Sequence, residues 1–225
     1  MSTGCERDGG HLFDESILNK AIEVHSRGPD TVLFGSNLKF GYCFMLEQKS
    51  NFLGDFVRRK DQKNYSTEIQ PGFKLHHYID HYIDTHATVN KSKIRLRPQF
   101  GHYSPVIVDM YYDHLLALNW SHFSKISLEN FTYHFYTLTD KNKSIFPKKA
   151  HHILYYMKRD NWLCEYRTLE GIDKALTGMS RRTKFVSKME SAAFKLKENF
   201  SQYQEDFNSF FPELLTEINC VRNQL

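Results

Sequence analysis

The feature that most constrains the fold is the segment 105–120, PVIVDMYYDHLLALNW, which is apolar around most of its helical circumference. Ser104 and Pro105 give this segment a start signal, a capping hydroxyl followed by proline at the first helical position. A helix that is apolar on most faces has to be covered by other elements on most faces. The sequence therefore predicts a central helix with further elements packed around it.

The remaining segments predict helices rather than strands. Apolar residues recur at helical spacing over 14–25 and 51–59, whereas residues 27–45 lack this period and predict a loop or short extended structure. Two further helices are expected over about 71–85 and over 89–97, where Pro98 is the stop. Others are expected to begin after Ser127, Pro147 and Thr168. The last forty residues are expected to form one helix or two, with Pro212 at the break. The fold class that we expect is an all-α, single-domain helical bundle.

Composition excludes several classes of protein. With 40% hydrophobic and 25% charged residues the chain is globular rather than disordered. No window approaches the roughly 18 apolar residues of a membrane span, and the polar start MSTGCERDGG argues against a secretory signal. The four cysteines lie far apart without a CxxC pair, which argues against a zinc knuckle or disulfide scaffold and favours the reducing cytoplasm.

The charge is unevenly distributed along the chain. Residues 1–50 carry five Lys/Arg against seven Asp/Glu, whereas residues 51–225 carry twenty-five against nineteen. The second part therefore has a net charge of +6 and favours an acidic partner. Its basic residues are scattered rather than striped, so we do not expect a nucleic acid to be the partner.

Two predicted helices carry acidic residues and histidines at a spacing of four. His76, Asp80 and Asp84 follow one another at i, i+4 and i+8, so they form one stripe on a helix. Asp109 and Asp113 repeat the spacing, and His114 follows directly. A divalent cation shared between the helices would remove the cost of burying these carboxylates.

A structural role is the alternative for any single residue of this kind. A lone buried His or Asp is more often a hydrogen-bonded core or capping group than a ligand. We give the structural interpretation to the remaining histidines of the segment and its neighbours: His77, His81, His122, His134, His151 and His152. For the two stripes, the pattern alone leaves a metal or catalytic site and a structural role equally weighted.

Five sequence blocks occur in an order that resembles the acyl carrier protein phosphodiesterase family, which is distantly similar to HD-type metal phosphohydrolases. The blocks are NFLGDFV (51–57), G-x-x-L-H-x-x-I-D-x-x-x-D-x-H (72–86), VIVDMYYDHLLALNW (106–120), WLCEYRTLEGI (162–172) and GMSRR (178–182). The resemblance implies a helical domain of this type over 51–225, preceded by an atypical N-terminal segment, residues 1–50, of one helix plus loop.

The resemblance also implies an activity, a cofactor and a partner. Members of the family remove 4′-phosphopantetheine from a serine of acyl carrier protein, using a divalent metal that is typically Mn²⁺. Carried over by position, the residues implied as metal ligands are Asp55, His76, Asp80 and Asp113. The general acid or base would be His114 or Asp84, with His86 and Asp109 as supporting groups. Phosphate would be bound by Arg58 and Arg182. For the two arginines, an ordinary solvated charge or surface ion pair is equally compatible with the sequence.

One departure from the family pattern leaves alternatives open. Family members usually begin with Asn-Phe-Leu-Ala-His, about eighteen residues before the NFLGD block, whereas here only His11 and His25 precede that block. Either His25 substitutes for that histidine or the site has one ligand fewer. The alternative functions are a related metal phosphohydrolase acting on a nucleotide or another phosphodiester, and a non-catalytic helical binding protein.

Overall fold

The computed structural model describes residues 51–222 and 224. The helix expected over 14–25, the loop expected over 27–45, and His11 and His25 lie outside the described residues. Within 51–222 all regular elements are helices and no strand occurs, which confirms the predicted all-α fold. None of the described helices combines the length and the apolar character needed to cross a membrane.

The helices follow one another with short connections. Those that matter for the arrangement, in chain order, are α3 (Asn51–Phe56), α4 (Arg59–Gln62), α5 (Gln70–Thr85), α6 (Ala87–Phe100), η1 (Gly101–Tyr103), α7 (Ser104–Leu118), α8 (Trp120–Phe123), α9 (Leu128–Lys141), η2 (Lys143–Ile145), α10 (Lys148–Arg159), α11 (Trp162–Glu165), α12 (Leu169–Ser180), η3 (Met189–Ser191), α13 (Ala192–Glu198) and α14 (Phe200–Arg222).

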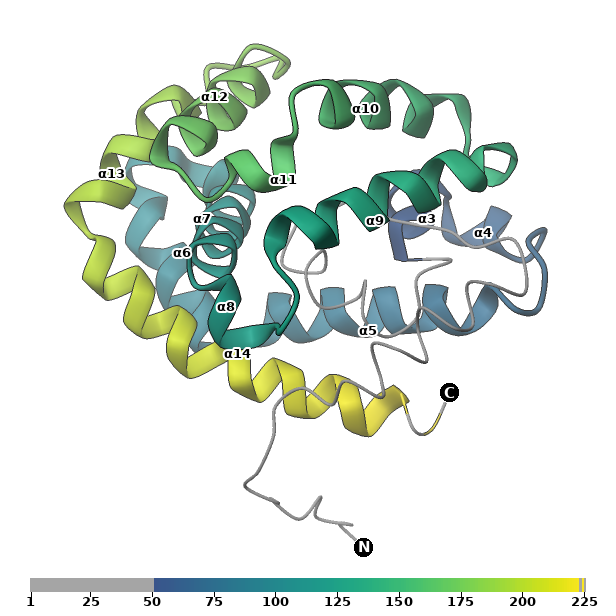
Figure 1. The fold of residues 1–225 in the computed structure, drawn as a ribbon. Helices are drawn as coiled ribbons and strands as arrows, with labels where there is room; N and C mark the ends of the chain where they lie inside the picture. Colours follow the sequence, from purple (N-terminus) through teal and green to yellow (C-terminus); the bar gives the residue numbers. More distant parts are fainter. Residues whose placement is uncertain (1–50, 223, 225) are drawn as a thin grey trace, which may run out of the picture.

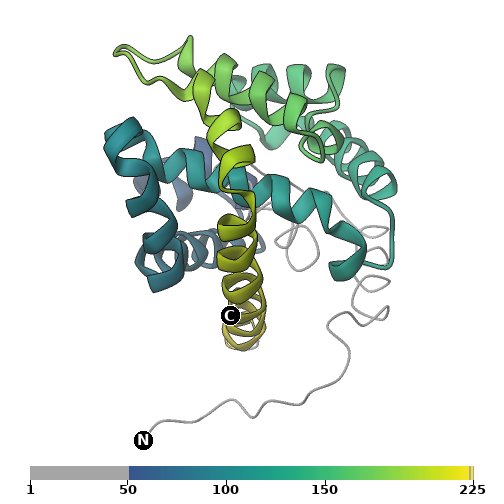
Figure 2. The same ribbon diagram turned by 90° about the vertical axis from the view of Figure 1, so that its left-hand side faces the viewer.

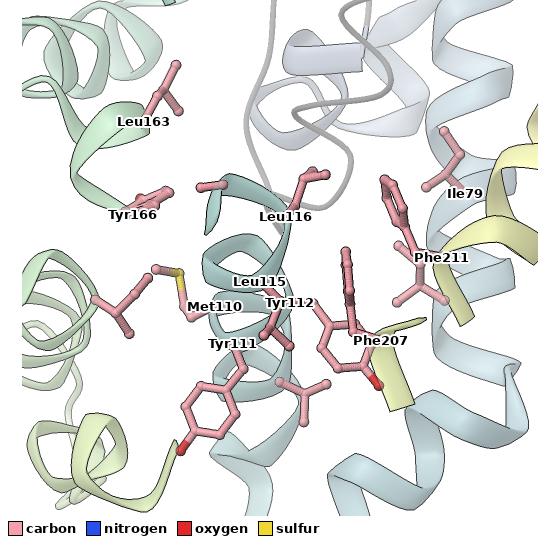
Figure 3. Packing of buried hydrophobic residues seen from close by; sticks show 14 of the residues in the cluster. Ile79, Met110, Tyr111, Tyr112, Leu115, Leu116, Leu163, Tyr166, Phe207 and Phe211 are labelled. Carbon is pink, nitrogen blue, oxygen red and sulfur yellow. The ribbon is translucent and has the colours of Figure 1, made fainter. Parts of the chain in front are cut away.

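Helix α7 is the central element, as its sequence predicts. It packs against α6, α12 and α14, and α5 and α14 run side by side below it in Figure 1. Figure 3 shows side chains leaving α7 in different directions, with Met110 on the side of Tyr166 and Tyr112 on the side of Phe207. The rings of Tyr112 and Phe207 meet edge to face with centroids 5.6 Å apart. The apolar circumference of α7 is therefore covered on several sides.

The helices expected after Ser127 and Thr168 begin there, and both residues cap their helices. The Ser127 hydroxyl accepts a hydrogen bond from the Asn130 N–H, and the Thr168 hydroxyl accepts one from the Gly171 N–H. The predicted capping role of Ser104 is wrong, although α7 does begin at this residue. Its hydroxyl donates to the Gly101 carbonyl at 2.8 Å, because the preceding turn η1 leads directly into the helix and brings that acceptor within reach.

The expected proline boundaries are also wrong. Pro98 lies inside α6, which continues to Phe100 and ends at Gly101, where φ is +54°. A proline close to a helix end removes only one N–H, whereas a left-handed φ ends the helix outright. Pro212 lies inside α14, and the break in the C-terminal region falls at Asn199 instead. There the side-chain amide of Asn199 donates to the Lys195 carbonyl and ends α13.

The segment 51–59 forms two short helices instead of one. Helix α3 ends at Phe56, and Arg58 adopts an extended conformation (φ −60°, ψ 141°) before α4 begins. The other expected helices occur close to their predicted bounds. The split matters for the site, because it lets α3 lie across α5.

Candidate functional site

An imidazole between two carboxylates marks the centre of the site. His76 on α5 is buried, with 2% of its surface exposed. Its Nε2 lies 3.1 Å from Oδ2 of Asp80, one turn further along α5, and 3.8 Å from Oδ1 of Asp55 on α3. The i, i+4 spacing explains the first contact, and the packing of α3 on α5 explains the second.

The close approach of α3 to His76 depends on Gly54. A Cβ atom at this position would lie 2.4 Å from the imidazole ring, a distance that no real carbon contact tolerates. Gly54 therefore allows the backbone of α3 to cover the buried face of His76. The neighbouring Asp55 then reaches the same imidazole from the other helix.

His77 joins the cluster, although the sequence suggested only a structural role for it. One ligand atom each from His76, His77 and Asp80 lie within 4.8 Å of one another. Nε2 of His77 is also 3.0 Å from Oε1 of Gln62. Imidazole and carboxylate together are a donor set that suits Mn²⁺ or Zn²⁺, so these residues fit a divalent cation. The adjacent pair of histidines was the signal in the sequence.

A cavity of about 860 Å³ opens beside Asp55. Helices α3, α7, α10, α11 and α12 contribute residues to its lining, which is largely apolar. Three predicted site residues are among those that line it: Asp55, Asp109 and Arg182. This volume falls within the range of pockets that bind small molecules and cofactors.

The cavity is also lined by charged residues that were not predicted from the sequence. They are Lys149, Asp160, Glu165 and Lys174. Nζ of Lys174 lies 3.6 Å from Oε2 of Glu165, and hydrogen bonds from Arg159 hold the pKa of Asp160 below its usual value. Glu165 belongs to the block WLCEYR, which was the available signal, whereas the two lysines resemble ordinary surface residues in the sequence.

Asp113 and His114 are buried on α7, with 4% and 2% of their surfaces exposed, and are not among the residues that line the cavity. Nδ1 of His114 is 2.8 Å from the carbonyl oxygen of Tyr166, a residue that lines the cavity. Because a carbonyl only accepts, Nδ1 carries the proton and Nε2 is an acceptor. Burial lowers the pKa of His114, and the hydrogen bond to Tyr166 opposes this only in part. The imidazole is therefore neutral near pH 7.

Three predicted site residues make contacts outside the described lining of the cavity. Asp84 accepts a hydrogen bond from Nζ of Lys93 at 2.9 Å and is 71% exposed. Nδ1 of His86 accepts from the Thr88 N–H at the start of α6, and its Nε2 lies 3.2 Å from Glu213. Arg58 forms a surface ion pair with Asp61 at 2.8 Å.

The predicted residues thus fall into groups. His76 and Asp80 lie in the cluster with Asp55 beside them, whereas Asp113 is not part of the group within 4.8 Å. Asp109 and Arg182 face the cavity, and Nε of Arg182 donates to the Gly178 carbonyl. The structure gives the positions and contacts of these residues. Their roles as catalytic groups and metal ligands stay predictions.

Comparison with known proteins identifies the family. The family model described as acyl carrier protein phosphodiesterase matches residues 46–214. The protein of this name from Photorhabdus laumondii is 26% identical over 166 residues, covering 73% of this chain and 84% of that protein. The one from Escherichia coli O6:H1 is 23% identical over 188 residues, covering 82% and 96%. No solved structure matches the chain. Because the family match spans most of its length, the chain belongs to the acyl carrier protein phosphodiesterase family.

Proposed function

We propose that this protein hydrolyses the phosphodiester bond between 4′-phosphopantetheine and a serine of acyl carrier protein, with a divalent cation, in the cytoplasm. The observation that carries the proposal is His76, held between Asp80 and Asp55 beside a cavity of about 860 Å³. The family and the names of its relatives supply the substrate and the phosphodiesterase activity. Cluster and cavity together offer a place for a cation next to a place for a phosphate group.

The cation would be held by the carboxylates and imidazoles of the cluster. Asp55, His76 and Asp80 are the proposed ligands, and the distances among them support this assignment. Asp113 remains a proposed ligand from α7, and His77 is an additional one. When bound, such a cation polarises phosphoryl oxygens and lowers the pKa of a coordinated water; Mn²⁺ is the metal that we expect.

Positive side chains around the cavity would bind the phosphate. Arg182, Lys149 and Lys174 line it, and each has the charge and the N–H groups to donate to phosphoryl oxygens. The apolar lining, which includes Val106, would contact the uncharged part of the pantetheine arm. The chain's own residues would thereby orient the phosphodiester toward Asp55 and the cation cluster beside it.

His114 is the better supported of the two proposed proton carriers. Its imidazole is neutral near pH 7 with Nε2 as an acceptor, which is the state that a general base requires. Asp84 instead holds Lys93, which argues for a structural role there. Because His114 is buried and does not itself line the cavity, it would act on the reaction through a neighbouring group or water.

Substitution of the proposed ligands tests the function. We expect Asp80→Ala and Asp113→Asn to lower the rate of phosphopantetheine release from holo acyl carrier protein by more than about 100-fold. Far-UV circular dichroism should show the helical content of the unmodified protein. Asp140→Ala is the matched control, because Asp140 is exposed on α9 and pairs with Lys158. Near-normal turnover of either ligand variant with added Mn²⁺ would show that the proposed site is wrong.

A further inference from the structure

The connection between α12 and η3 concentrates positive charge. Residues 181–188, RRTKFVSK, contain Arg181, Arg182, Lys184 and Lys188 and no acidic residue. The four cations are exposed. The formal net charge of the whole chain is also +4, so acidic and basic residues balance over the remainder. Figure 2 shows this connection projecting from the body of the molecule at the upper left. We call residues 181–188 the basic segment.

The tip of the basic segment is apolar. Phe185 is 72% exposed and Val186 is 86% exposed, which are the largest exposed fractions among the large hydrophobic side chains that the structure describes. Two adjacent side chains of this kind, surrounded by cations, are unusual on a surface that contacts only water. Such a combination is typical of a protein interface, where apolar anchors are buried and charges surround them.

The base of the segment is held in place while its tip is exposed. The hydroxyls of Ser180 and Ser187 lie 2.8 Å apart, and Ser187 is buried. The Thr183 hydroxyl lies 2.8 Å from the carbonyl oxygens of both Ser180 and Phe185. Lys188 adopts a left-handed conformation with φ of 58°, which turns the chain toward the buried Met189. These contacts order the segment, so a partner that binds its tip loses less conformational entropy.

The basic segment begins beside residues that line the cavity. Gly178 and Met179 on α12 line the cavity, as does Arg182, the second residue of the segment. A partner that binds Phe185 and Val186 therefore lies close to Arg182, which lines the cavity. A group attached to that partner by a flexible arm would reach the cavity and the cluster beyond it.

We propose that the basic segment is the docking surface for the carrier protein, with Phe185 and Val186 buried in an apolar spot that acidic side chains of the partner surround. The proposal rests on the proposed function, because the phosphodiester of that substrate is attached to a serine on the surface of an acidic protein. The complementary charges accelerate the encounter and make it sensitive to salt. An anionic membrane could also attract such a segment, but the phosphodiester that the proposed function requires is carried by a protein.

Comparing a protein substrate with a short peptide substrate separates the effect of a substitution on docking from its effect on the hydrolysis step. The variants are Phe185→Ser combined with Val186→Ser, and Arg181→Glu combined with Lys184→Glu. Their matched controls are Tyr133→Ser, which changes an exposed aromatic on α9, and Lys143→Glu in η2. Steady-state kinetics would be measured on holo acyl carrier protein and on a short peptide that carries phosphopantetheine on serine. We expect KM for the protein substrate to rise by about tenfold or more in both segment variants, with kcat and turnover of the peptide unchanged.

The outcomes distinguish the two proposals. If KM for the protein substrate is unchanged, or if turnover of the protein and of the peptide falls equally, the docking surface lies elsewhere. If the unmodified protein hydrolyses neither substrate, the proposed function fails, and binding of apo acyl carrier protein at low and high salt then tests the segment alone. Weaker binding by the segment variants but not by the controls supports docking; equal binding overturns it. Loss of binding to phosphatidylglycerol vesicles with unchanged carrier binding would overturn it in favour of a membrane contact.

Discussion

At the scale of single residues, the site depends on how closely α3 approaches the imidazole of His76. The ring is buried, and two carboxylates reach its Nε2 from different helices. Gly54 makes this possible, because any side chain at its position would occupy the space of the ring. A residue with no functional group of its own therefore sets the geometry of the groups that carry the chemistry.

We predict that Gly54→Ala weakens binding of Mn²⁺ by at least about tenfold, because the new methyl group forces His76 away from Asp55 and Asp80. Isothermal titration calorimetry with Mn²⁺ measures this effect. The matched control is Gly178→Ala, since a Cβ atom at Gly178 meets no atom within 4 Å and should leave cation binding intact. Wild-type affinity in Gly54→Ala would contradict the proposed position of the cation.

Local sequence spacing predicted only some of the contacts around this site. The i, i+4 spacing placed His76 and Asp80 together, because helix geometry alone brings such residues into contact. The contact with Asp55 and the cavity positions of Lys149 and Lys174 depend on how separate helices pack, which local spacing does not encode. Asp84 continues the same stripe, but its carboxylate turns to Lys93 on the next helix.

At the scale of elements, a buried carboxylate joins α6 to α14. Asp206 on α14 is 3% exposed and accepts hydrogen bonds from Lys91, Ser92 and Arg95 on α6, each at 2.8 to 2.9 Å. Burial on its own would raise the pKa of Asp206, but these three donors outweigh it and hold the pKa below its usual value. The α6–α14 interface therefore depends on the ionised form of this carboxylate.

We predict that Asp206→Asn lowers the free energy of unfolding by about 2 kcal/mol at pH 7, because it removes the buried negative charge that accepts hydrogen bonds from Lys91, Ser92 and Arg95. In the unmodified protein the carboxylate's contribution is present above about pH 4 and is lost as the pH falls through the folded-state pKa, since the unfolded chain takes up the proton first. Urea unfolding at several pH values measures both effects. Asp140→Asn, at an exposed ion pair, should change stability by less than about 1 kcal/mol. Equal losses in the two variants would contradict this account of the interface.

The elements themselves were largely predictable, and the exceptions have physical causes. Helices begin after Ser127 and Thr168 as expected, because the hydroxyls of these residues accept hydrogen bonds from backbone N–H groups of the first turn. Pro98 and Pro212 did not end their helices, because the packing of α6 and α14 against each other and against their neighbours compensates for one missing hydrogen bond. Local signals of this kind predict a boundary only where tertiary contacts do not compete with them.

At the scale of the whole molecule, the basic segment, the cavity and the cluster around His76 adjoin one another. The basic segment projects from the body of the molecule and shares Arg182 with the cavity lining, the cavity carries positive side chains, and the cluster around His76 contacts Asp55, which also lines the cavity. The central helix α7 supports this arrangement, because it contributes Asp109 to the cavity and packs against α12. A carrier protein docked outside could thus deliver its phosphopantetheine arm to the carboxylates inside.

The most direct test of this account is mass spectrometry of holo acyl carrier protein after incubation with the protein and Mn²⁺, with a chelator control. The account predicts a loss of about 340 Da from the carrier protein, the mass of the phosphopantetheine group, that the chelator prevents, as a cation-dependent hydrolase requires. No loss of mass with a protein whose helical content is intact would contradict the proposed function. The same loss in the presence of the chelator would retain the activity and contradict the role of the cation.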